Sequence, residues 1–157
     1  MSHTHHGCPG ARVIDFAAPE EETAALEGTR PSQLRQWPIQ LHLVSPAAPY
    51  FQNADVVLVA DCVAYAIGDF HKDHLAGHSI AIACPKLDQG LDIYRDKITA
   101  LVDEAKINTL TVMTMEVPCC GALLQVAKSG VAQASRKIPV KSKVVSLRGE
   151  ILAEEWV

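Results

Sequence analysis

Cysteine is the residue type in this sequence whose placement could carry chemistry. The 157 residues contain five cysteines, which is too few for a disulfide-stapled fold of this length and is an odd number. In a reducing compartment, such thiols favour metal binding or thiol chemistry over disulfide bridges. They are Cys8, Cys62, Cys84, Cys119 and Cys120.

Four of these cysteines follow apolar segments that are typical of buried parallel strands. The expected strands and the cysteines that follow them are Asp55–Ala60 with Cys62, Ser79–Ala83 with Cys84, and Thr109–Met115 with Cys119 and Cys120. Open parallel sheets bind ligands beyond the carboxyl ends of their strands, and neighbouring strands are only about 4.8 Å apart. We therefore expect the four thiols to converge on one site.

Three kinds of chemistry suit such a group of thiols. Four or five thiolates are typical ligands of an iron-sulfur cluster, with the 4Fe-4S type favoured here, and they would also suit a closed tetrahedral zinc site. The C-x-x-C pairs that are usual for zinc are absent. The third alternative is thiol redox chemistry at Cys119 and Cys120 without a metal. Packing alone explains the vicinal pair poorly, because adjacent residues at a helix start do not face the same core.

The predicted helix that begins near Pro118 adds to this chemistry. Unpaired N–H groups and the positive end of the helix dipole are expected to lower the pKa of the Cys119 and Cys120 thiols. Gly121, which follows directly, would let backbone or a bulky inorganic group approach closely.

Histidines give a weaker signal. His71 and His74 are spaced one helical turn apart and His78 follows, which could make a nitrogen-rich second site, but solvated polar-face residues are the favoured interpretation. A histidine-rich group beside Cys8 is either a metal-capturing arm or a flexible tail. Its members are His3, His5 and His6.

The alternation of strands and helices predicts an α/β fold: a three-layer, mostly parallel sheet with helices on both faces, preceded by an irregular N-terminal arm. The arm covers residues 1–30 and the α/β domain residues 31–157. Other expected elements are a short strand at 39–44, a helix from Cys62 to Gly77, a helix capped by Asp88, a helix opened by Pro118, a last strand at 140–147 and an apolar tail at 151–157.

Composition excludes several functions. With 48% hydrophobic and 20% charged residues, a net charge of -4 and no basic tract, the chain is a poor binder of nucleic acid or anionic membranes. It has no apolar run of about 18 residues and no signal-peptide pattern, so we expect a cytoplasmic protein. Motifs for dinucleotides, nucleoside triphosphates and serine hydrolases are absent. The tail around Trp156 is compatible with a homo-oligomer or partner interface.

Several longer segments resemble a known family. They are residues 31–41 (PSQLRQWPIQL), 60–63 (ADCV), 84–88 (CPKLD) and 115–121 (MEVPCCG), together with the linker element GCPG at 7–10. The chain resembles, over about residues 7–150, the C-terminal α/β domain of 4Fe-4S ferredoxin-type proteins. The N-terminal ferredoxin motifs of that family are absent from this sequence, so its two-cluster electron relay does not carry over.

A second, partial resemblance concerns residues 119–121. They look like the CCG motif of heterodisulfide reductase-type subunits, with Cys84 at the position of the preceding single cysteine, although the following C-x-x-C is missing. Because the sequence shows no acid-base or nucleophilic constellation other than the thiols, we expect an iron-sulfur protein with an electron-transfer or redox accessory role, rather than a stand-alone enzyme. The two resemblances imply a redox partner such as a ferredoxin, with Cys62, Cys84, Cys119 and Cys120 as ligands and Cys8 reaching the cluster from the arm.

Overall fold

The computed structural model describes residues 28–157. The predicted arm, with Cys8 and the histidines beside it, therefore lies outside the described residues, apart from the last residues before Pro31. In the described part, no helix is long and apolar enough to cross a membrane.

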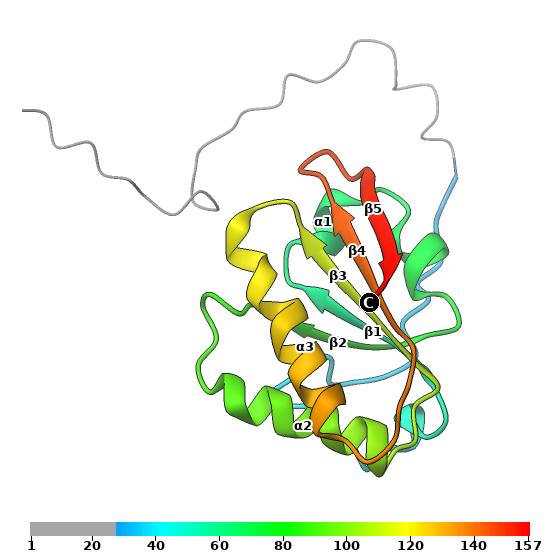
Figure 1. Cartoon of the computed structure of the whole chain (residues 1–157). Coiled ribbons are helices and arrows are strands. Elements are labelled where there is room, and N and C mark those ends of the chain that lie inside the picture. The colour runs from blue at the N-terminus through cyan, green and yellow to red at the C-terminus, as the bar shows by residue number, and fades with distance from the viewer. Residues whose placement is uncertain (1–27) are drawn as a thin grey trace, which may run out of the picture.

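A five-stranded sheet forms the centre of the molecule (Figure 1), in the order β2-β1-β3-β4-β5. The first three pairings in this order are parallel, and β5 runs antiparallel to β4. The mostly parallel sheet predicted from the sequence is thus confirmed. The strands are β1 (Asp55–Ala60), β2 (Ser79–Ala83), β3 (Thr109–Met115), β4 (Val140–Val145) and β5 (Ile151–Trp156).

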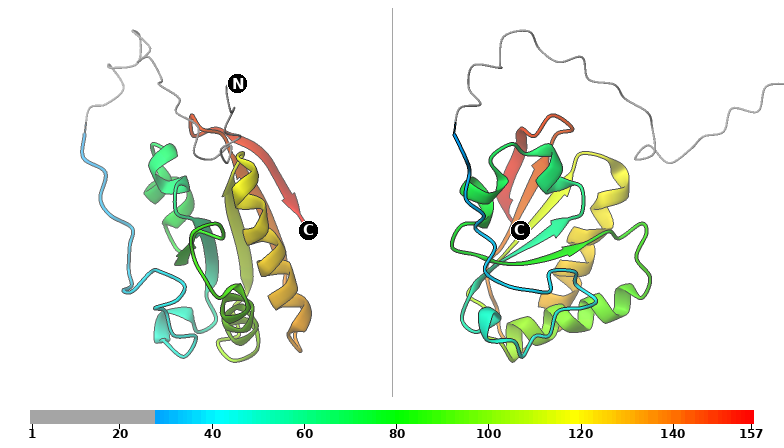
Figure 2. Two further views of the ribbon diagram at one scale, coloured as in Figure 1. Left: turned by 90° about the vertical axis from the view of Figure 1, so that its left-hand side faces the viewer. Right: turned by 180° about the vertical axis from the view of Figure 1, so that it is seen from behind.

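Two layers cover the sheet. The longer helices α2 and α3 pack against each other on one face, and the view from behind in Figure 2 shows α1 and the segment after residue 28 over the other face. The predicted three-layer α/β architecture is therefore confirmed. The helices are α1 (Val63–Ala66), α2 (Leu91–Asp103) and α3 (Gly121–Gln133), with 3-10 turns η3 (Pro49–Phe51) and η5 (Pro118–Cys120) and the π-helix η4 (His71–Leu75).

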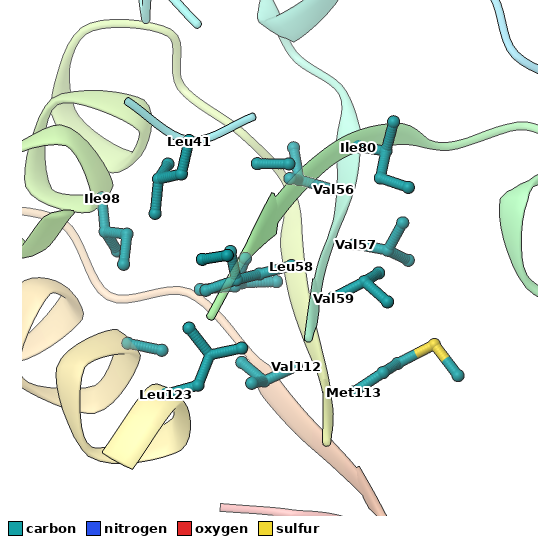
Figure 3. Packing of buried hydrophobic residues seen from close by; sticks show 14 of the residues in the cluster. Leu41, Val56, Val57, Leu58, Val59, Ile80, Ile98, Val112, Met113 and Leu123 are labelled. Carbon is teal, nitrogen blue, oxygen red and sulfur yellow. The ribbon is translucent and has the colours of Figure 1, made fainter. Parts of the chain in front are cut away.

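Consecutive side chains of a strand point to opposite sides of the sheet, so consecutive apolar residues make both faces apolar. In β1, Leu58 lies on the side of Ile98 and Leu123 from α2 and α3, whereas Val59 lies with Met113 on the other side (Figure 3). All five side chains are almost completely buried. Burial on both faces explains why residues 56–60 of β1 are a continuous apolar run and why β3 is rich in apolar residues.

Two expected elements are shorter than predicted. Residues 39–44 form only one parallel bridge, between Gln40 and Ile82, and then turn. The Lys97 ammonium stabilises this turn by donating to the carbonyls of residues 41, 42 and 44 at 2.6–2.9 Å. The helix expected from Cys62 to Gly77 is divided into α1 and η4, because the backbone becomes extended at Ile67.

The predicted apolar tail is the edge strand β5. A tight turn leads into it, in which Gly149 has a φ of +86° and the Ser146 hydroxyl accepts the amides of Arg148 and Glu150. A Cβ at Gly149 would lie 2.2 Å from the carbonyl oxygen of Ala66, so this turn packs directly against the end of α1. The β4–β5 hairpin thereby supports the helix that begins beside Cys62.

Candidate functional site

The strand order reverses between β1 and β3. From β1 the chain passes to β2 on one side, and from β2 it crosses back to β3 on the other side. In open α/β sheets, ligands bind outside the carboxyl ends of the strands at such a switch point. Here the two loops at the switch point carry Cys62, after β1, and the Cys119–Cys120 pair, after β3.

The four described cysteines occupy three neighbouring strand ends and are all free thiols. Cys62 directly precedes α1 and is exposed, and Cys84 follows β2 and is half-buried. Cys119 is half-buried in η5, and Cys120 at the end of the same turn is buried. The fold therefore places the four residues on one edge of the sheet, as their positions in the sequence predict.

The thiols also influence one another electrostatically. Partial burial raises the pKa of Cys62, and the charge of Asp61 and the thiols of Cys84 and Cys119 raise it further. Burial likewise raises the pKa of Cys120, and Cys119 and Cys62 contribute to this rise. Cys62 therefore lies near enough to Cys84, Cys119 and Cys120 for their charges to interact.

The expectation of a lowered thiol pKa is wrong for Cys120. Burial raises the pKa of this thiol to about 11, although a backbone hydrogen bond with Met115 acts in the opposite direction. Cys120 is only 7% exposed, and desolvation disfavours the thiolate more strongly than the helix start favours it. In the metal-free protein, Cys120 is therefore a protonated thiol at neutral pH.

Asp88 holds the loop that carries Cys84. Its Oδ2 atom accepts the Cys84 amide at 2.9 Å, the Gln40 side-chain amide at 3.1 Å and the hydroxyl of the fully buried Tyr94. The prediction that Asp88 caps a helix is wrong, because its carboxylate is engaged by these donors and α2 begins after Gly90 instead. The backbone at Cys84 is thus fixed by a half-buried hydrogen-bond network.

Two further features shape the immediate surroundings of the thiols. Burial, and then the charge of Asp88, raise the pKa of Asp61, so an acidic pair flanks the cysteines. At Gly121, which follows Cys120, an added Cβ would meet no atom within 4 Å. Open space therefore lies beside the vicinal cysteines.

A preformed site for a single metal ion is absent from the described residues, because no three or more His, Cys, Asp or Glu side chains are grouped closely enough. The histidines do not join the cysteines. His71 Nδ1 accepts the Gln33 amide at 3.0 Å, His78 Nδ1 contacts the Ala76 carbonyl at 2.9 Å, and His74 is half-buried with no partner for Nδ1. The favoured interpretation of solvated polar residues is therefore only partly correct.

Comparison with known proteins places this architecture in a family. Residues 48–157, which include all five strands and the four described cysteines, match a family described as a Rossmann-like domain. The chain belongs to this Rossmann-like domain family. An uncharacterized protein of Archaeoglobus fulgidus is 29% identical over 119 residues, which cover 76% of this chain and 83% of that protein. No solved structure gives a significant match.

The loop after β1 differs from that of dinucleotide-binding Rossmann folds. The phosphate-binding fingerprint G-x-G-x-x-G belongs at that position, because its glycines let the backbone approach a pyrophosphate. Here the loop reads Asp61-Cys62-Val63 and contains no glycine. The residues that this chain brings to the switch point are thiols.

Proposed function

We propose that this Rossmann-like domain binds an iron-sulfur cluster through Cys62, Cys84, Cys119 and Cys120 and serves in electron transfer. The observation that carries the proposal is the placement of four free thiols at the carboxyl ends of three adjacent strands. Cluster binding accounts for the position of all four cysteines without a catalytic role for any of them.

The absence of a preformed single-ion site among the described residues is compatible with a cluster. A zinc ion needs its ligands within one coordination sphere, and the described residues offer no group of three that is already arranged in this way. In a cluster each thiolate binds its own iron, so the ligands stand farther apart. The open space at Gly121 is where inorganic sulfide and iron have room.

The chain's own residues would tune such a site. Asp88 and Tyr94 hold the Cys84 loop, and burial of Cys120 limits the access of water. When bound, the cluster supplies one-electron exchange. The exposed Cys62 marks the side from which a redox partner could approach.

The resemblance to the C-terminal domain of 4Fe-4S ferredoxin-type proteins and to the CCG motif supports the same proposal. It adds a ferredoxin as the class of partner and Cys8 as a fifth cysteine near the site. Zinc binding as a structural or interaction module is the second candidate, because four thiolates also suit zinc if the loops move inward.

Thiol redox catalysis by Cys119 and Cys120 is the least favoured of the three candidates. Attack on a disulfide requires a thiolate, and a thiol with a pKa of about 11 is ionised to only a very small extent at neutral pH. Metal binding can overcome the same pKa, because the metal displaces the thiol proton.

Anaerobic reconstitution of the full chain with iron and sulfide tests the proposal. We expect stoichiometric iron and acid-labile sulfide, broad visible absorbance, and bleaching on reduction with dithionite. Each single change of the four cysteines to alanine should lower the iron content, whereas Ser129→Ala, an exposed change on α3, should not. Colourless protein that retains zinc, or metal-free protein with all thiols titratable, would exclude the cluster.

A further inference from the structure

Two adjoining cavities lie on the face of the sheet opposite α2 and α3. The inner cavity has a volume of about 290 Å³ and the outer one about 420 Å³. Both are lined by Ala64, Phe70 and His71, so they meet at these three residues. Residues 30–34 form part of their walls. The cysteines line neither cavity, although Asp61, the neighbour of Cys62, lines the inner one.

The inner cavity is mainly apolar. Val59 of β1 and Ile80 and Ile82 of β2 form its floor, and Leu34 and Leu75 also line it. A volume near 300 Å³ with apolar walls is at the lower end of the range for small-molecule sites in proteins. It suits a short hydrocarbon or aromatic group.

Positive charge predominates in the outer cavity. Arg30 and Lys72 line it together with one carboxylate, Asp69. Arg30 donates to Asp69 only through Nε, at 2.9 Å, and the terminal guanidinium nitrogens have no hydrogen-bond partner among residues 28–157. Lys72 makes only a loose ion pair with Asp73, at 4.0 Å. The donors of both cations remain available to an anion.

His71 supplies a further donor at the junction of the cavities. Its Nδ1 atom accepts the Gln33 amide at 3.0 Å, which places the proton of the neutral imidazole on Nε2. Nε2 has no hydrogen-bond partner in the described part of the chain. The fold thus fixes the tautomer that can donate to a ligand.

From this arrangement we propose that the paired cavities bind a small amphipathic carboxylate. Its apolar part occupies the inner cavity, and its carboxylate is held in the outer cavity by Arg30, Lys72 and the Nε2–H of His71. Asp61 also lines the inner cavity, and its charge disfavours a carboxylate placed in that cavity. The proposal does not depend on the cluster.

NMR titration of the metal-free, ¹⁵N-labelled full chain with octanoate and with 1-octanol tests this proposal. Octanoate should give saturable amide shifts around Ala64 and His71, whereas 1-octanol, which has the same chain length and no charge, should bind at least about tenfold more weakly. Equal affinities for the two probes would overturn the recognition of an anion. Absence of saturable shifts with octanoate would overturn the site itself.

Two pairs of variants locate the site. Ala64→Phe fills the junction and should abolish octanoate binding, whereas Ala132→Phe, at an exposed alanine on α3, should leave it unchanged. Lys72→Gln should weaken octanoate several-fold and leave octanol unaffected, and Lys128→Gln is its matched control. Full octanoate affinity in either Ala64→Phe or Lys72→Gln would contradict the assignment. Lys72→Gln keeps the test valid if Ala64→Phe does not fold.

Discussion

Gly130→Ala provides a quantitative test of the packing between α2 and α3. A Cβ at Gly130 would lie 2.8 Å from the Arg95 carbonyl oxygen and 2.8 Å from two side-chain carbons of Ile98. One of these neighbours is backbone and the other is a buried branched side chain, so neither can move easily. Overpacking of this kind costs about 1–3 kcal/mol.

Gly121→Ala is the matched control, because both glycines belong to α3 and a Cβ at Gly121 meets nothing within 4 Å. Alanine is favoured over glycine by up to about 1 kcal/mol inside a helix, and by less at Gly121, which is the first residue of α3. We therefore expect Gly121→Ala to be neutral or slightly more stable than wild type, and Gly130→Ala, where this gain offsets part of the overpacking, to fall below wild type by up to about 3 kcal/mol.

Urea unfolding of the metal-free protein, followed by circular dichroism, measures both free energies. The difference in free energy of unfolding between the two variants separates the cost of the close contact at Gly130 from the general effect of replacing glycine by alanine in α3. Equal stabilities would refute the close approach of α2 and α3 at Gly130.

Three other measurements probe the burial described above. Gln36→Leu should lose about 2–4 kcal/mol, because the Gln36 side chain pairs with both the N–H (2.7 Å) and the carbonyl (2.8 Å) of Ile80, whereas the exposed Gln133→Leu should change the free energy of unfolding little. Burial, and then the charge of Lys143, lower the pKa of His74, so the unfolded chain binds more protons than the folded chain below about pH 6.5 and the free energy of unfolding should fall there. His74→Gln should make the difference in this free energy between pH 7.5 and pH 5 smaller. A difference as large as that of wild type would count against the lowered pKa. Alkylation of Cys120 in metal-free protein, followed by peptide mass spectrometry, should still accelerate about tenfold per pH unit between pH 8 and 10, and a plateau below pH 9 would disagree with a pKa of about 11.

The buried strands could be predicted from the sequence almost residue by residue. Asp55–Ala60, Ser79–Ala83 and Thr109–Met115 are rich in apolar and β-branched residues because both faces of a parallel sheet are covered, and this burial leaves a local signature. The same strands predict that the four described cysteines converge, because each cysteine lies just beyond the end of one of them.

Elements that depend on distant partners could not be predicted in this way. β5 has no alternating apolar pattern and exists because β4 offers it a pairing edge, including the ion pair between Lys141 and Glu154 at 2.8 Å. Asp88 has the sequence context of a helix cap, but Tyr94 and the Cys84 amide engage its carboxylate in the folded chain. Long-range hydrogen bonds thus override local preference.

The chemistry of individual side chains depends equally on tertiary structure. The position of Cys120 at a helix start predicts a low pKa, whereas its burial raises the pKa to about 11. The paired cavities also escape prediction, because they form only when residues 30–34 cross over α1 and η4. The segment is held there by the hydrogen bonds of Gln36 to β2.

The iron and acid-labile sulfide content of the Cys120→Ser variant tests the shared thiol site most directly. After anaerobic reconstitution, wild-type full chain should hold about four iron and four sulfide per molecule, as a 4Fe-4S cluster requires. Cys120→Ser should lose most of both while its metal-free form unfolds at a urea concentration close to that of wild type. A variant that kept its full iron and sulfide would contradict the account, because Cys120 would then not be part of the site.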